Sequence, residues 1–162
     1  ALTEVAGPVE IVAEDLGIIP ESVIELRRSH GLPGMAVLHF AFDDENLDNP
    51  HRPENIGSDR IVYTGTHDND TTMGWWEDSS DERKQRVNSE GLSGETPCDT
   101  LIRLAAQTPA PLAVIPMQDI LELGKQARMN TPGTTGGNWS WRFDWSDISA
   151  QRWDRFTQLV KR

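Results

Sequence analysis

The sequence IVYTGTHDNDTT at residues 61–72 begins as a short apolar strand pattern and runs directly into a cluster of polar side chains. Three other stretches, at residues 9–13, 35–42 and 112–115, have a similar short apolar pattern. Strands that are apolar on both faces are typical of a parallel sheet covered by helices. Because helical patterns separate these stretches, the sequence favours parallel βαβ units, in an open doubly wound sheet or in a (β/α) barrel.

The helices are predicted from apolar spacing and from the residues that begin or end helices. The predicted segments are residues 20–30, one or two surface helices within 71–92, and residues 99–108, 117–127 and 146–161. Asp99 is expected to cap the helix at 99–108. Trp153 is expected to lie in the core, on the apolar face of the last helix.

The glycine pattern separates the two α/β architectures. No predicted strand is followed by the GxGxxG or GxxxxGK[ST] sequences whose loops bind phosphate in nucleotide-binding folds. A barrel is therefore favoured, and four strands are half of an eight-stranded barrel of about 250 residues. We expect residues 1–162 to form a single partial domain, the C-terminal half of a (β/α)8 barrel with about four parallel strands and intervening helices, without its N-terminal strands.

Charge and cysteine content exclude several partners. The 162 residues contain 26 Asp and Glu against 15 Lys and Arg, a net charge of −11, which repels nucleic-acid phosphates and anionic membranes. No apolar run approaches the roughly 18–20 residues that cross a bilayer. The single cysteine, Cys98, indicates a reducing compartment, so a cytoplasmic location is expected. No cofactor is indicated.

Polar residues at strand ends form the candidate site, since parallel barrels place their active sites at the C-terminal ends of strands. Glu14 follows the first predicted strand, residues 66–70 follow the third, and Gln118 follows the fourth. Pairs of carboxylates a few ångströms apart perform acid/base chemistry on glycosidic bonds. Alternatively, acidic residues after strands cap the next helix, which we expect of Asp15 and Asp70.

His67 beside Asp68 and the tryptophans allow more than one interpretation. The pair is either a structural hydrogen-bonded pair or half of a metal site, but no His-x-x-His or cysteine cluster supplies further ligands. No metal site is therefore predicted. Trp139 and Trp141 follow a Gly-rich loop, where they either stack on a sugar ring or pack in the core.

Five motifs in this order resemble the amylomaltase, or 4-α-glucanotransferase, family. They are IVAEDLG at residues 11–17, GLPGM at 31–35, YTGTHDNDTT at 63–72, ARMNTPG at 127–133 and GNW at 137–139. Each motif falls where a strand end or a loop is predicted. The resemblance implies a (β/α)8 barrel that cleaves an α-1,4-glucan, holds the fragment as a covalent glycosyl-enzyme, and passes it to the 4-hydroxyl of another sugar with retention of configuration.

The resemblance also implies roles for individual residues. Glu14 resembles the general acid/base of the family, and Asp68 resembles the carboxylate that stabilises the transition state. The implied substrate-binding residues are His67, Phe40, Gln118 and Asn138, to which Trp139 is added as the candidate for stacking on a sugar ring. The implied partner is a maltooligosaccharide or another α-1,4-glucan.

One feature of the family is absent from this sequence. The family's nucleophilic aspartate lies in an Arg-x-Asp-His sequence upstream of the IVAEDLG motif, and the 162 residues do not contain it. Retaining chemistry needs two carboxylates about 5–5.5 Å apart, so we expect the isolated chain to be inactive and to need the N-terminal part of the same barrel. Two alternatives remain. One is a non-catalytic carbohydrate-binding module, and the other is an amylase-like hydrolase, because the residues alone do not distinguish sugar from water as the acceptor.

Overall fold

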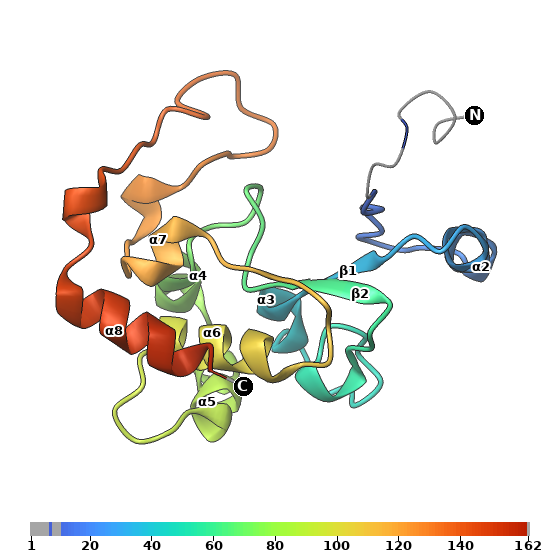
Figure 1. Ribbon diagram of the computed structural model, residues 1–162, viewed down its shortest axis with the longest axis horizontal. Helices are drawn as coiled ribbons and strands as arrows, with labels where there is room; N and C mark the ends of the chain where they lie inside the picture. Colours follow the sequence, from blue (N-terminus) through green and yellow to red (C-terminus); the bar gives the residue numbers. More distant parts are fainter. Residues whose placement is uncertain (1–6, 8–10, 162) are drawn as a thin grey trace.

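A parallel three-stranded sheet forms the centre of the described structure. The computed structural model describes residue 7 and residues 11–161, with strands β1 (Gly34–Val37), β2 (Arg60–Tyr63) and β3 (Ala113–Val114) in the order β1-β2-β3 (Figure 1). Both pairings are parallel, as predicted. The pairing places the carboxyl ends of the three strands at the same edge of the sheet.

The first predicted strand is wrong in its described part. Residues 11–13 form no strand, and a backbone bond from the Ala13 N–H to the Pro33 carbonyl at 3.0 Å ties them to the segment before β1. Val9 and Glu10 lie outside the described residues.

The second predicted strand, at residues 35–42, is correct only in its first half. After β1 the chain turns at once into the short helix α3 (Leu38–Ala41). Leu38 and Ala41 are as buried as the strand before them. A continuous apolar run does not reveal whether a buried segment is strand or helix, so the sequence pattern missed this change.

Helices precede, connect and follow the strands. They are α2 (Glu21–Ser29), α4 (Thr72–Asp78), α5 (Asp81–Glu90), α6 (Pro97–Gln107), α7 (Met117–Ile120) and α8 (Ala150–Leu159), with 3-10 turns at Pro53–Asn55, Lys125–Ala127 and Trp145–Asp147. The predicted surface region 71–92 therefore contains two helices, while the predicted helix 117–127 contains only α7 and a 3-10 turn. No helix among residues 11–161 is long and apolar enough to cross a membrane.

Side-chain caps fix the starts of the longer helices. Thr71, Ser80 and Ser149 each accept a hydrogen bond from a backbone N–H in the first turn of α4, α5 and α8. The cap of α6 is Thr96, followed by a proline at the first helical position, so the prediction that Asp99 caps this helix is wrong. Asp99 lies one turn further on, where its carboxylate is paired with two arginines of α8.

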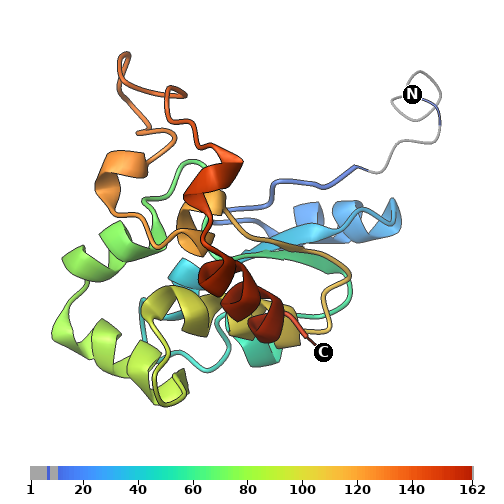
Figure 2. The same cartoon turned by 60° about the vertical axis from the view of Figure 1, so that its left-hand side comes forward.

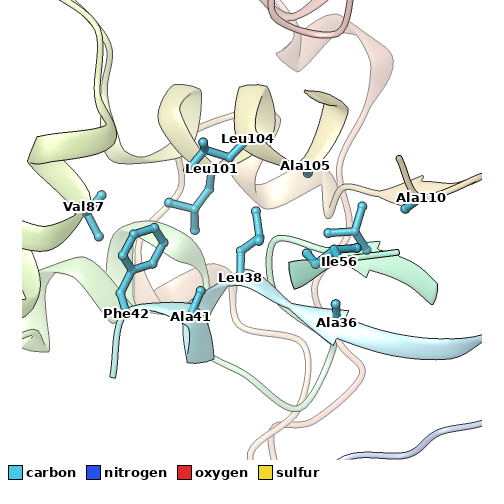
Figure 3. Packing of buried hydrophobic residues seen from close by; sticks show 11 residues of the cluster. Ala36, Leu38, Ala41, Phe42, Ile56, Val87, Leu101, Leu104, Ala105 and Ala110 are labelled. Carbon is cyan, nitrogen blue, oxygen red and sulfur yellow. The ribbon is translucent and has the colours of Figure 1, made fainter. Parts of the chain in front are cut away.

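The hydrophobic core lies between α6 and the sheet. Figure 3 shows Leu101 of α6 pointing toward Leu38 of α3, with Phe42 and Val87 at one end of the cluster. The buried cluster is formed by Ala36, Leu38, Ala41, Phe42, Ile56, Val62, Val87, Leu101, Leu104, Ala105 and Ala110. Each buried Leu contributes roughly 1.5–3 kcal/mol by removing apolar surface from water, so α6 fixes this face of the sheet.

Helix α8 is attached to the molecule differently from the prediction. Trp153 is 46% exposed and contacts Phe156 at a ring-centroid distance of 5.6 Å, so its predicted place in the core is wrong. Instead, Arg152 and Arg155 hold α8 against the buried carboxylate of Asp99, at 2.7 and 3.0 Å. Charge pairing, and not the apolar face alone, sets the position of this helix.

Candidate active site

A cavity of about 560 Å³ lies at the carboxyl ends of the three strands. Its walls come from the segment before α2, from α3, from the β2–α4 loop, from the start of α7, and from the loop after the Lys125–Ala127 turn. The β2–α4 loop and the loop after residue 127 extend to the same side of the sheet in both views (Figures 1 and 2). This is the edge where parallel α/β barrels carry their active sites.

Six of the seven site residues predicted from the sequence line this cavity. They are Glu14, Phe40, His67, Asp68, Gln118 and Trp139. The fold therefore brings together residues that are up to 125 positions apart along the chain (14 to 139). Asn138, the seventh, is not among the lining residues. It holds the adjacent loop, accepting from the Thr131 N–H at 2.9 Å and donating to the Thr134 hydroxyl at 2.9 Å.

Asp15 anchors the segment that carries Glu14. Its carboxylate accepts a hydrogen bond from the Met35 N–H at 2.7 Å and lies 3.2 Å from the Arg27 guanidinium, and the side chain is only 7% exposed. The prediction that Asp15 caps a helix is therefore wrong, because α2 begins after Pro20. With Asp15 held inward, Glu14 is exposed at the cavity wall.

Tyr63 is a cavity residue to which the sequence assigned no role. It is the last residue of β2 and lines the cavity together with Glu14. Burial and the nearby Glu14 carboxylate both raise the pKa of the Tyr63 hydroxyl. The phenol therefore stays protonated beside the predicted acid/base and is available as a hydrogen-bond donor. Its place at the end of a strand, inside the YTGTHDNDTT motif, was a signal that could have identified it.

The β2–α4 loop presents His67 and Asp68. The two side chains lie 3.3 Å apart, and each is about half exposed, at 49% and 47%. The Asp68 carboxylate accepts a hydrogen bond from the Asn130 side chain at 2.6 Å, which fixes its orientation. Among the described residues no group of three or more His, Cys, Asp or Glu could hold a metal ion. His67 and Asp68 are thus a close pair whose side chains both line the cavity.

The loop after residue 127 is tied to the His67–Asp68 loop. The Arg128 guanidinium donates to the Asp68 carbonyl at 2.7 Å and to the Asn130 carbonyl at 2.8 Å. The Asn130 N–H donates in turn to the His67 carbonyl at 3.1 Å. Arg128 and Asn130 belong to the ARMNTPG motif, but no role was predicted for either of them. Both residues join the two loops, and this role depends on contacts between segments that are about 60 positions apart in the sequence.

Trp139 covers the outer end of this arrangement. Its ring centroid lies 5.0 Å from that of His67, and 54% of the residue is exposed. The backbone has φ of 59°, a left-handed conformation that costs a non-glycine residue free energy and is found most often at functional sites. The Trp139 N–H donates to the Met129 carbonyl at 2.7 Å, which holds this conformation. An exposed, fixed indole at a cavity rim is suited to stacking on a sugar ring.

Two further cavity residues are held by contacts of their own. The ring of Phe40 meets the edge of His51 at 5.3 Å. Gln118 is buried and donates to the Ala127 carbonyl at 3.1 Å. Asp70, expected to cap a helix, is not the cap of α4, since Thr71 fills that position. Asp70 faces Arg128 instead, at 3.7 Å.

Glu14, Asp68 and the exposed indole of Trp139 line one open cavity at the carboxyl edge of a parallel sheet, which is where α/β barrel proteins carry their functional sites. Residues 1–148 match the family model described as 4-alpha-glucanotransferase. The chain belongs to the 4-alpha-glucanotransferase family, and the resemblance drawn from its motifs is confirmed.

Relatives in this family are substantially longer than this chain. The chain is 49% identical over 144 residues to the chloroplastic/amyloplastic 4-alpha-glucanotransferase of Arabidopsis thaliana, and covers 25% of that protein and 88% of its own length. It is 52% identical over 136 residues to the 4-alpha-glucanotransferase of Synechocystis sp., covering 27% of that protein and 82% of its own length. The chain therefore spans about a quarter of these relatives.

A solved structure matches the fold over almost the whole chain. It is the amylomaltase from Streptococcus agalactiae in complex with acarbose, with a TM-score of 0.90 and 33% sequence identity, covering 98% of this chain and 32% of that one. The match confirms the predicted fold class: the parallel sheet and its helices are part of an amylomaltase barrel. The number of strands in the described part is three and not four.

Proposed function

We propose that these residues are the acid/base half of a 4-α-glucanotransferase active site, which transfers α-1,4-glucan segments between maltooligosaccharides with retention of configuration. The observation that carries the proposal is one cavity, in a chain of this family, lined by Glu14, His67, Asp68 and Trp139. Carboxylates, a hydrogen-bond donor and an aromatic platform are the groups that glycosyl transfer requires.

Glu14 acts as the general acid/base. It protonates the leaving glycosidic oxygen and later removes the proton from the acceptor hydroxyl. Its exposed position on the cavity wall allows both steps, and the Tyr63 phenol beside it supplies a neutral donor. The ion pair of the neighbouring Asp15 with Arg27 keeps Glu14 in place through both steps.

Asp68 stabilises the transition state. The hydrogen bond from Asn130 and the proximity of His67 hold its carboxylate toward the cavity, where it can bind the hydroxyls of a distorted sugar. Trp139 stacks on a sugar ring, Phe40 and Gln118 contact the glucan chain, and Asn138 acts through the loop that it holds. A solved relative is in complex with acarbose, which supports glucan binding by this family.

The second carboxylate comes from the rest of the barrel. A retaining mechanism needs a nucleophile about 5–5.5 Å from the acid/base, and the family resemblance assigns it to a sequence that these 162 residues lack. We propose that the upstream part of the same barrel completes the site. The free, buried Cys98 fits a reducing compartment, for which we propose the cytoplasm.

The test is a maltotriose disproportionation assay on the complete enzyme that contains these residues. Wild-type enzyme should release glucose and form a ladder of longer maltooligosaccharides, with a nearly constant number of reducing ends. Glu14→Gln and Asp68→Asn should each lower kcat by about 10³-fold or more while maltotriose still binds, because each removes a group needed in the transition state.

Glu25→Gln serves as the control, since Glu25 is an exposed carboxylate of α2 that does not line the cavity. Its kcat should equal that of the wild type. Retained turnover in Glu14→Gln or Asp68→Asn contradicts the assigned role. A steady rise in reducing ends indicates a hydrolase, and glucan binding without any product indicates a binding module.

A further inference from the structure

A buried group of polar side chains lies beneath the loop that carries His67 and Asp68. Asp119, Thr64, Thr72 and His39 are each at most 1% exposed. Each follows one of the three strands or begins the helix after β2. Buried polar groups destabilise a protein unless they are hydrogen-bonded, so such a group persists only where its members satisfy one another.

The Asp119 carboxylate joins the two ends of the loop. One oxygen accepts a hydrogen bond from the Thr64 hydroxyl at 2.6 Å, immediately before loop residues 65–71. The other accepts from the Thr72 backbone N–H at 2.9 Å, immediately after them. A single side chain from α7 therefore holds both the exit from β2 and the entrance to α4.

His39 contacts the same two ends from the β1 side. Its backbone N–H donates to the Thr64 carbonyl at 3.2 Å, and its Nε2 lies 2.9 Å from the Thr72 hydroxyl. The imidazole stacks on Trp75 with centroids 4.6 Å apart. Gly65 approaches the ring so closely that a β-carbon there would lie 2.7 Å from Cε1. The first residue of the loop is thus packed directly on the ring.

The protonation of His39 agrees with this arrangement. Burial, together with the charge of Arg83, lowers the pKa of His39 to about 3, so the ring is neutral near pH 7. With its proton on Nε2 the ring donates to the Thr72 hydroxyl, which is then free to donate to the Asp119 carboxylate. The other ring nitrogen, Nδ1, has no hydrogen-bond partner among the described residues. In this tautomer Nδ1 carries no proton, so the ring leaves no buried N–H without an acceptor.

We infer that Asp119, supported by His39, is a positioning residue for the transfer reaction: by holding both ends of residues 65–71 it sets where His67 and Asp68 stand in the cavity. The inference rests on the proposed function. Asp119 borders the cavity but is only 1% exposed, and both of its oxygens are occupied by protein donors, so Asp119 acts through the loop and not on the sugar. Misplacing a catalytic group by about 1 Å can lower a rate about 100-fold.

The experiment uses Asp119→Asn, Thr64→Val and Thr64→Ser in the complete enzyme. Asparagine offers one acceptor oxygen where two are needed, and valine removes the Thr64 donor without changing the shape of the side chain. Both variants should lower kcat for maltotriose about 10–100-fold, with KM within about threefold of the wild type. Thr64→Ser keeps the hydroxyl and should retain kcat within about twofold.

Glu95→Gln is the matched control for stability. Glu95 is another carboxylate with a buried side chain, paired with Arg103 at 2.8 Å and outside the cavity lining. It should lower the Tm while leaving kcat unchanged. An unchanged kcat in Asp119→Asn and Thr64→Val overturns the inference, as does a loss of kcat that Glu95→Gln reproduces at an equal loss of Tm.

Amide hydrogen exchange separates this inference from the proposed function. In Thr64→Val, residues 65–71 should exchange at least about tenfold faster than in the wild type, while the Glu95→Gln variant should leave them unchanged. Faster exchange in Thr64→Val supports the positioning of the loop by Asp119 and Thr64. If the wild-type enzyme forms no maltooligosaccharide ladder, that separate result contradicts only the proposed function. Unchanged exchange at 65–71 overturns the positioning role whatever the activity.

Discussion

Glu14 and Asp15 are adjacent acidic residues with opposite environments. Asp15 is directed inward, where the Met35 N–H and Arg27 surround its carboxylate, and Glu14 is exposed to the cavity. Because Asp15 is anchored directly beside it, Glu14 is held at the cavity wall. The two carboxylates therefore divide structural and chemical tasks between them.

His39 should make the stability of the protein sensitive to acid. Its folded pKa of about 3 lies below the unfolded value of 6.5, so between these values the unfolded chain binds the proton and the folded chain does not. The free energy of unfolding should fall by roughly 4–5 kcal/mol as the pH falls from 6.5 toward 3. Urea unfolding of wild type and His39→Gln across this range tests this: the stability advantage of the wild type should shrink by about that amount as the pH falls toward 3.

The control for this prediction is His30→Gln, because His30 is exposed at the end of α2. Its unfolding free energy should follow the wild type at every pH. If wild type and His39→Gln keep a constant difference between pH 6.5 and pH 4, burial does not suppress the ionisation of His39.

The sequence indicated most of the residues that line the cavity, but not the buried contacts that hold them in place. Glu14, His67 and Asp68 stand in sequence motifs and all line one cavity, although residues 11–13 before Glu14 form no strand. Their catalytic roles stay predictions. The ion pair of Asp15 and the clamp formed by Asp119 could not be predicted. They depend on partners 12 to 55 positions away, and no local pattern distinguishes a buried carboxylate with such partners from a helix cap.

At the level of elements, β1 depends on a close contact at its first residue. A β-carbon on Gly34 would lie 2.3 Å from an Asp15 carboxylate oxygen. Gly34→Ala should therefore expel Asp15 from its contacts with Met35 and Arg27. We expect a loss of about 2–4 kcal/mol in the free energy of unfolding and a reduced kcat, because Glu14 moves with its neighbour. Urea unfolding and the maltotriose assay measure the two effects.

Gly136→Ala provides the comparison, since no atom lies within 4 Å of the position of its β-carbon. It should change stability by less than about 0.5 kcal/mol. Equal stabilities of Gly34→Ala and Gly136→Ala indicate that Asp15 can move aside without cost.

The sequence predicted helices better than strand ends. α4 and α5 fall within the polar region predicted to hold one or two surface helices, and Thr71 and Ser80 cap them in the structure. The change from β1 to α3 was missed because both segments are buried and apolar. The position of α8 was missed for a different reason: its attachment depends on Arg152 and Arg155, whose partner Asp99 lies on another helix.

At the level of the whole molecule, the described sheet has unpaired edges. β3 pairs on one side with β2, and Leu112, directly before the strand, and Val114, within it, are 51% and 37% exposed. Exposed apolar edge strands associate with other chains. The 162-residue chain alone should therefore self-associate at micromolar concentration, whereas the complete enzyme should not do so through this edge.

Sedimentation velocity of both proteins, with Leu112→Lys in the isolated chain as the comparison variant, tests this prediction. The lysine should shift the isolated chain toward the monomer, since charge at a strand edge opposes association. A monomeric wild-type chain at all concentrations contradicts the proposed exposed edge.

The parallel ladder also affects how fast the polypeptide reaches its native structure. Gly34 pairs with Arg60, 26 positions later (34 to 60), and Val62 pairs with Ala113, 51 positions later (62 to 113). Closing loops of this length costs chain entropy before any pairing compensates for it, so native contacts of this kind slow folding. Since the cavity needs all of these segments at once, catalytic competence should appear only at the end of folding, and the nascent enzyme should depend on protection of its apolar strands until then.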